Sequence, residues 1–129
     1  LDKMIKNDMV STVVAISSGA ATKPKFGWLN YCCSKSMLKM MIENYAEEND
    51  KIKFYSLAPG LVKTSMQDKI VRTDPDIIPS VLRFQQEYDT MDSPEIVANN
   101  IYNCLEQVNL KPSGAFIDIR KDIKNVSLR

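Results

Sequence analysis

An α/β fold with a parallel sheet is the architecture that this sequence of 129 residues predicts, and three consecutive segments carry the prediction. Residues 10–18 contain the run Val-Val-Ala-Ile, which is too brief for a helix and β-branched enough for a strand buried on both faces. Residues 28–49 follow a helical pattern, and residues 52–58 form a second apolar run. A strand, a long helix and another strand make a βαβ unit, whose crossover we expect to be right-handed.

The remaining segments predict shorter elements around this unit. Helices are expected at residues 1–8, 65–72, 80–88 and 93–108. The last of these begins with Ser93 as N-cap and Pro94 at the first helical position, which is typical of a helix start. Residues 115–119 predict the last strand, and the polar residues from Lys121 onward predict a loose tail.

The long helix is expected to bury one face in the core. Its apolar stripe consists of Leu38, Met41, Ile42 and Tyr45. Because a methionine side chain is flexible and fills irregular gaps, Met37, Met40 and Met41 predict adaptable core packing rather than a cofactor contact.

The composition indicates an ordinary globular chain. It is 44% hydrophobic, and its 17 basic and 16 acidic residues leave a net charge of +1, so neither nucleic acid nor an anionic membrane is expected as a partner. No apolar run reaches the roughly 20 residues of a membrane span. The three cysteines are unpatterned, which favours a reducing, cytoplasmic setting. Since the sequence has no histidine, a zinc site or a Ser-His-Asp triad is not expected.

Ser18, Tyr31 and Lys35 are the candidate catalytic residues. Tyr31 and Lys35 are four residues apart in the predicted helix, so they share one face and the ammonium lies beside the phenol. A neighbouring positive charge stabilises the phenolate, which helps the phenol to hand a proton to a carbonyl oxygen at neutral pH. Ser18, at the end of the first strand, can hold the same oxygen by a hydrogen bond. The alternative is that Tyr31 only packs and that Lys35 is a solvated helix charge.

The spacing of these three residues, together with Leu-Ala-Pro-Gly-Leu-Val-Lys-Thr at residues 57–64, resembles the active site of the short-chain dehydrogenase/reductase family. The resemblance implies a doubly wound parallel-sheet (Rossmann-like) domain that reduces carbonyl compounds. It implies NADPH as the cofactor. The choice of NADPH over NADH rests on analogy with the family alone, because the residues that make this choice lie in the family's first half. The resemblance also assigns Tyr31 and Lys35 to cofactor binding, with Lys35 on the nicotinamide ribose.

The segment from Pro59 to Thr64 is expected to hold the nicotinamide end of that cofactor. Pro59 and Gly60 break the chain at the carboxyl end of a strand, where ligands gather in such sheets, and a glycine lets the backbone approach a ligand closely. The resemblance implies that the backbone at Val62 bonds the carboxamide, with the Thr64 hydroxyl nearby. An ordinary strand-to-helix turn is the alternative.

Within the family, the sequence is most similar to sepiapterin reductases and to diketone-reducing relatives such as benzil reductases. The similar segments are Lys-Phe-Gly-Trp-Leu-Asn-Tyr-Cys around Tyr31, Thr-Ser-Met-Gln from Thr64, and Ser-Gly-Ala-Phe-Ile-Asp ending at Asp118. The resemblance implies that Asp118 binds the substrate alongside Ser18, since a carboxylate can accept the paired N–H donors of a pterin. A small diketone as substrate, with Asp118 a solvated acid, is the alternative.

The resemblance covers only the second half of the family's fold. Residues 1–129 are therefore expected to form a partial domain that lacks the Gly-rich turn for the cofactor's pyrophosphate, with residues 65–92 as a substrate lid. A homodimer through the long helix is expected from the family. Two alternatives are a truncated, inactive fragment and a non-enzymatic interaction module of the same fold.

Overall fold

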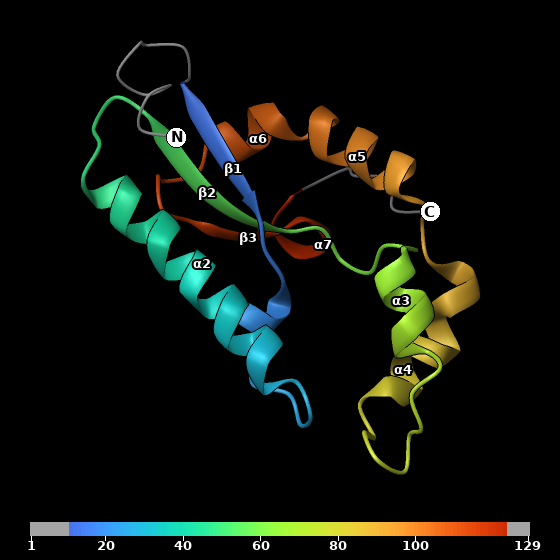
Figure 1. Ribbon diagram of the computed structural model, residues 1–129. Coiled ribbons are helices and arrows are strands. Elements are labelled where there is room, and N and C mark those ends of the chain that lie inside the picture. Colours follow the sequence, from blue (N-terminus) through green and yellow to red (C-terminus); the bar gives the residue numbers. More distant parts are fainter. Residues whose placement is uncertain (1–10, 124–129) are drawn as a thin grey trace.

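The computed structural model describes residues 11–123 of the chain (Figure 1). The helix predicted at residues 1–8 lies outside the described residues. In chain order the elements are β1 (Thr12–Ile16), the 3-10 helix η1 (Gly19–Ala21), α2 (Leu29–Glu47), β2 (Lys53–Ala58), α3 (Ser65–Ile70), α4 (Val81–Glu87), the 3-10 helix η2 (Tyr88–Thr90), α5 (Pro94–Asn103), α6 (Leu105–Asn109), β3 (Phe116–Asp118) and α7 (Ile119–Asp122).

The three strands form one parallel sheet in the order β1-β2-β3. Val14 of β1 lies opposite Tyr55 of β2, and Leu57 of β2 lies opposite Ile117 of β3. Since β1 and β2 are parallel and α2 connects them, the predicted βαβ unit is confirmed, and so is the α/β class.

Helices cover both faces of the sheet, and the alternation of side chains along β2 explains why (Figure 1). Phe54 faces α2, where it packs with Ile42 and stacks on Tyr45 at 5.5 Å between ring centroids. Leu57 faces the opposite layer, where it packs with Val108 of α6. Both β2 side chains are fully buried. Burying such a side chain stabilises the fold by about 1.5–3 kcal/mol, so β2 is the centre of two cores.

Two burial predictions are wrong for the described residues. The first strand is half-buried rather than enclosed, and Ile16 is 49% exposed, because β1 is an edge of the sheet whereas β2 has a neighbour on each side. The three methionines of α2 are exposed, Met37 at 63%, Met40 at 58% and Met41 at 47%. Only a narrow face of α2, centred on Ile42, reaches the sheet.

The C-terminal part differs from its prediction in three places. The helix expected at residues 93–108 is divided at the buried Cys104, whose N–H bonds to carbonyls three and two residues earlier. The last strand ends at Asp118, and Ile119 begins α7. Residues 121–123 are not a loose tail, since α7 continues to Asp122 and Ile123 is buried in the core. Periodicity alone predicted none of these boundaries.

Candidate active site

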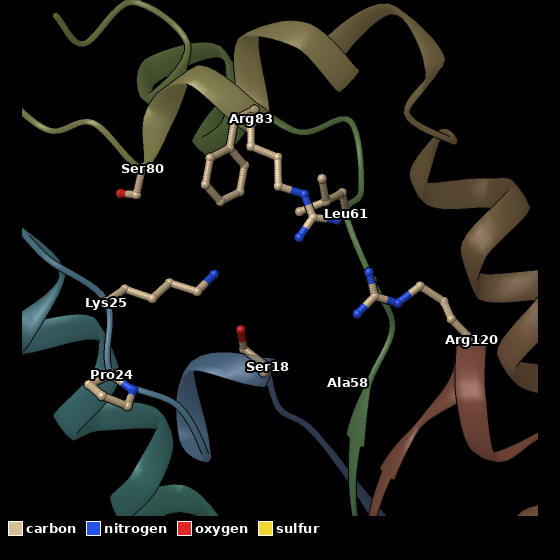
Figure 2. Close-up of a pocket in the computed structure, with 11 residues that line it drawn as sticks. Ser18, Pro24, Lys25, Ala58, Leu61, Ser80, Arg83 and Arg120 are labelled. Atoms are coloured by element: carbon tan, nitrogen blue, oxygen red, sulfur yellow. The ribbon is translucent and has the colours of Figure 1, made fainter. Parts of the chain in front are cut away.

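A cavity of about 440 Å³ opens where β1 and β2 end. The residues that line it come from the loop after β1, the segment after β2, α4 and α7: Ser18, Gly19, Pro24, Lys25, Ala58, Gly60, Leu61, Ser80, Arg83, Phe84 and Arg120. Figure 2 shows polar side chains converging on its centre from three sides. Of the sequence-predicted site residues, Ser18 and Gly60 line this cavity.

Ser18 is held at the end of β1 by its own hydroxyl. It caps η1 in an extended conformation, and its Oγ accepts a hydrogen bond from the Ala20 N–H at 3.2 Å. Because that bond uses the oxygen as an acceptor, the hydroxyl proton is left to donate elsewhere. Figure 2 shows the Ser18 oxygen directed into the cavity.

Tyr31 and Lys35 lie in the first two turns of α2, next to the end of β1. The Lys35 ammonium donates a hydrogen bond to the Ile16 carbonyl at 3.0 Å, two residues before Ser18. The same ammonium is 5.9 Å from the centroid of the Tyr31 ring. The structure thus brings the phenol, the ammonium and the strand end together, while Tyr31 and Lys35 themselves do not contribute to the cavity lining that the described residues form.

The segment after β2 has the backbone freedom that its Pro-Gly pair predicts. Gly60 has a φ of +92°, and a Cβ at this position would lie 3.0 Å from the Arg120 Cδ, so glycine permits both the turn and the close approach of that side chain. Val62 forms an isolated parallel bridge with Asp92, in which the bond of 2.9 Å comes from the neighbouring Lys63 N–H.

Thr64 stands at the N-terminus of α3 in an extended conformation, and its hydroxyl makes no capping bond to that helix. A hydroxyl that is free at this point fits the predicted contact with the nicotinamide end of a cofactor. Pro59 is half-buried and lines a smaller cavity of about 90 Å³, which Gly60 lines as well. Within residues 11–123, no glycine cluster is present that would cradle the phosphates.

Asp118 is buried at the end of β3 and does not line the 440 Å³ cavity. Its carboxylate accepts two bonds from the Arg120 guanidinium, at 2.9 Å from Nε and 2.8 Å from Nη2. These bonds hold the pKa of Asp118 below its usual range, although burial opposes the shift. The backbone is fixed too, because the Asp118 N–H donates to Asp122 at 2.7 Å. Arg120, rather than Asp118, therefore reaches the cavity.

The lid predicted at residues 65–92 contains α3, α4 and η2, and it packs against the loop before α2. The Trp28 indole N–H donates to the Ser80 hydroxyl at 2.7 Å, and the Trp28 ring stacks on Phe84 at 5.3 Å. Gly27, with a φ of +79°, approaches Ile78 so closely that a Cβ would lie 3.0 Å from it. These contacts complete the cavity wall opposite the sheet.

Sequence reasoning missed three cations of this cavity. Lys25, Arg83 and Arg120 come from three separate segments and all line it. The Lys25 ammonium lies 5.7 Å from the Trp28 ring and 5.4 Å from the Phe84 ring. Partial burial lowers the pKa of Lys25, and the positive charge of Arg83 lowers it further. The only signal in the sequence was the Lys-Pro-Lys run at residues 23–25, so close to Tyr31.

Two kinds of site do not occur in the part of the chain that the structure describes. No group of three or more acidic, histidine or cysteine side chains is placed to hold a metal ion. No helix between residues 11 and 123 has the length and apolarity required to cross a membrane.

Comparisons with known proteins agree with this arrangement. The family model described as short chain dehydrogenase matches residues 1–75. A benzil reductase ((S)-benzoin forming) of Bacillus cereus is 39% identical over 113 residues, 83% of this chain and 45% of that protein. The sepiapterin reductase of Bos taurus is 34% identical over 109 residues, 83% of this chain and 40% of that protein. The chain thus spans less than half the length of these relatives.

Solved structures show the same fold. The KRED1-Pglu enzyme matches with a TM-score of 0.72 and 28% identity, over 82% of this chain and 46% of that one. The short-chain dehydrogenase/reductase YIR035C of Saccharomyces cerevisiae matches with a TM-score of 0.70 and 24% identity, over 85% of this chain and 46% of that one. The prediction of one half of a doubly wound parallel-sheet domain is therefore confirmed.

Proposed function

Because the chain belongs to the short-chain dehydrogenase family, whose members are oxidoreductases of small molecules that use NAD(P)(H), we propose that it carries a Ser-Tyr-Lys site for the NADPH-dependent reduction of a carbonyl compound. One observation supports this above the others. The Lys35 ammonium bonds the Ile16 carbonyl and lies near the Tyr31 ring, which fixes Lys35 and Tyr31 beside the end of β1, two residues before Ser18.

In the proposed mechanism, Ser18 and Tyr31 act on the carbonyl oxygen, and Lys35 acts on Tyr31. Ser18 donates its free hydroxyl proton to that oxygen as a hydrogen bond and orients the substrate. Tyr31 transfers its phenolic proton to the oxygen as negative charge develops there. Lys35 stabilises the phenolate that remains, because its ammonium lies beside the ring.

The bound cofactor would supply hydride to the carbonyl carbon. Lys35 would hold its nicotinamide ribose, with Tyr31 beside the cofactor, and Pro59, Gly60, Val62 and Thr64 would hold its nicotinamide end. The unbonded Thr64 hydroxyl and the positive φ of Gly60 support this assignment. Residues 65–92 would act as the lid that excludes water from the reaction, which the Trp28–Ser80 bond supports.

The names of the relatives suggest two substrates for the site, benzil and sepiapterin. A pterin would need Asp118 as an acceptor, and Arg120 already bonds both carboxylate oxygens of Asp118, which favours a smaller carbonyl compound over a pterin. Turnover of sepiapterin against benzil, with and without Asp118→Ala, separates the two substrates.

Two further properties belong to the same proposal. The exposed methionines of α2 support a homodimer through that helix, which sedimentation of the purified protein tests. The free thiols of Cys32, Cys33 and Cys104 support a cytoplasmic setting, which imaging of the tagged protein tests.

The decisive experiment replaces Tyr31 with Phe in the protein that carries this sequence. Loss of the acid should lower kcat for benzil by about 10²–10⁴-fold, while NADPH binding measured by fluorescence stays within about twofold. Tyr45→Phe is the matched control on the same helix, because Tyr45 packs on Phe54 away from the cavity and should keep full turnover. A Tyr31→Phe protein that turns over benzil like the parent would refute the assignment.

A further inference from the structure

The lining of the 440 Å³ cavity is unusually positive. It contains three cations, Lys25, Arg83 and Arg120, and among the described residues that line it there is no carboxylate. Figure 2 shows the Lys25 ammonium and the Arg120 guanidinium extending into the cavity from opposite sides, with the Arg83 guanidinium entering from above. Any bound molecule of moderate size therefore lies among these three charged groups.

The three cations differ in how their charges are balanced. Arg120 is paired with Asp118 through two hydrogen bonds. Arg83 is paired with Glu87 at 2.7 Å, through side chains that are 64% and 42% exposed, so solvent screens this pair. Lys25 has no carboxylate partner among residues 11–123, and its ammonium faces two aromatic rings instead. The cavity thus retains about one unit of uncompensated positive charge.

The uncompensated charge of the Lys25 ammonium lies close to other positive groups. The groups that act on Lys25 are the guanidinium groups of Arg83 on α4 and Arg120 on α7, which repel it, and the thiol of Cys32 on α2. Lys25 and Arg83 are both exposed to solvent, so water screens part of this repulsion, and the remainder raises the free energy of the empty site. A negative group between Lys25 and Arg83 would reverse the sign of both interactions and gain hydrogen bonds from ionised donors.

From these observations we propose that the carbonyl substrate of this site carries a carboxylate, which Lys25 and Arg83 bind while its carbonyl oxygen faces Ser18. The proposal rests on the reductase function proposed above and deepens it by naming the substrate class, 2-oxo acids with an apolar substituent. Phe84 provides the apolar wall for that substituent. Benzil, the substrate in the names of several relatives, has no charge and would not pair with Lys25 or Arg83.

The chain contains its own reporter for this test. Trp28 is its only tryptophan, and it contacts both Phe84 and the Lys25 ammonium at the cavity wall. Trp28 fluorescence is titrated with phenylglyoxylate and, in parallel, with its methyl ester, which has the same carbonyl and ring but no charge. We expect the acid to bind at least tenfold more tightly than the ester, and the difference to shrink as sodium chloride is raised.

Matched variants assign the effect to the two cations. Lys25→Met and Arg83→Met should each weaken binding of the acid at least tenfold and leave binding of the ester within twofold. Lys25→Arg keeps the charge and should retain the acid's affinity. Lys23→Met is the control, since Lys23 is exposed, lies two residues away and does not line the cavity. Far-ultraviolet circular dichroism checks that each variant is folded.

Equal affinity for acid and ester, absence of binding by both, or an unchanged affinity of Lys25→Met for the acid would each overturn the proposal. The readout is binding, so its outcome is separate from that of the reductase function. Selective binding of the acid with unimpaired turnover by Tyr31→Phe would refute the mechanism alone. Tyr31-dependent turnover without selective binding of the acid would refute the carboxylate alone.

Discussion

The two ends of the cavity are built in different ways. At the sheet end, Ser18, Gly60 and Arg120 follow β1, β2 and β3, so the parallel ladder and the cores beneath it fix their positions. At the lid end, Ser80 and Arg83 belong to a segment that stands away from the sheet (Figure 1). That segment is held over the cavity by side-chain contacts with Trp28.

This difference suggests a division of labour between the ends. A residue that follows a buried parallel strand cannot move without disturbing the core, which suits groups that must meet a reacting atom accurately. A segment that rests on a few side-chain contacts, with no strand pairing to the sheet, should open at a lower free energy, which suits entry and choice of substrate. Three substitutions test whether the two ends do respond differently.

The largest effect is expected from Gly60→Ala at the sheet end. Alanine would have to adopt a φ of +92° and would place its Cβ 3.0 Å from the Arg120 Cδ. The free energy of unfolding should fall by about 2 kcal/mol, measured by urea denaturation. Gly19→Ala is the control, because its Cβ would meet open space, and its stability should change by less than about 0.5 kcal/mol. Equal stability of the two variants would show that the sheet end is not rigid.

A smaller and pH-dependent effect is expected from Asp118→Asn. Removing the carboxylate leaves Arg120 without its ionic partner, which should cost about 1.5 kcal/mol at pH 7. Because the pKa of Asp118 is lowered, the ion pair is complete above the ordinary aspartate pKa and is lost as pH falls through the lower value of the folded state. The difference in unfolding free energy between parent and variant should therefore begin to shrink as the pH falls to about 4, and it should vanish only below the lowered pKa of the folded state.

That comparison needs denaturation curves at several pH values for the parent, the Asp118→Asn variant and Asp50→Asn, in which an exposed aspartate is replaced. The exposed control should match the parent throughout. A stability difference for Asp118→Asn that persists undiminished in acid would mean that the carboxylate acts through packing rather than through its charge.

The smallest effect, and the most local one, is expected from Ser80→Ala at the lid end. The change removes the acceptor of the Trp28 indole bond, which should cost about 1 kcal/mol. Hydrogen exchange should rise about fivefold in residues 81–87 and stay unchanged in residues 53–58. Ser34→Ala is the control, since that exposed hydroxyl bonds only the Tyr31 carbonyl in its own helix. A uniform rise across the sheet would mean that lid and sheet unfold as one unit.

The difference between the sheet end and the lid end also explains which features could be predicted from the sequence. The βαβ unit follows from a β-branched run, an amphipathic helix and a second apolar run, which are local signals. Ser18, Tyr31 and Lys35 were identified because family spacing and helical periodicity agree. The partial exposure of β1 and the exposure of Met40 were missed, since burial depends on which elements pack alongside and not on the residue itself.

The cations of the cavity were beyond sequence reasoning for a related reason. Lys25 and Arg83 are 58 positions apart and meet only because the lid packs on Trp28. Arg120 was overlooked because it falls between the strand expected to end at residue 119 and the tail expected from Lys121, whereas it lies in α7 and bonds Asp118. Charged residues that are far apart in the sequence and come together only in the fold leave no periodic pattern in the sequence.

The hydrogen bond from the Lys35 ammonium to the Ile16 carbonyl bears on how the site assembles when α2 docks on β1. One ammonium both fastens the start of α2 to the tip of β1 and lies beside the Tyr31 ring. The contact that docks the helix on the strand therefore also fixes the position of the ammonium beside the ring of the proposed acid.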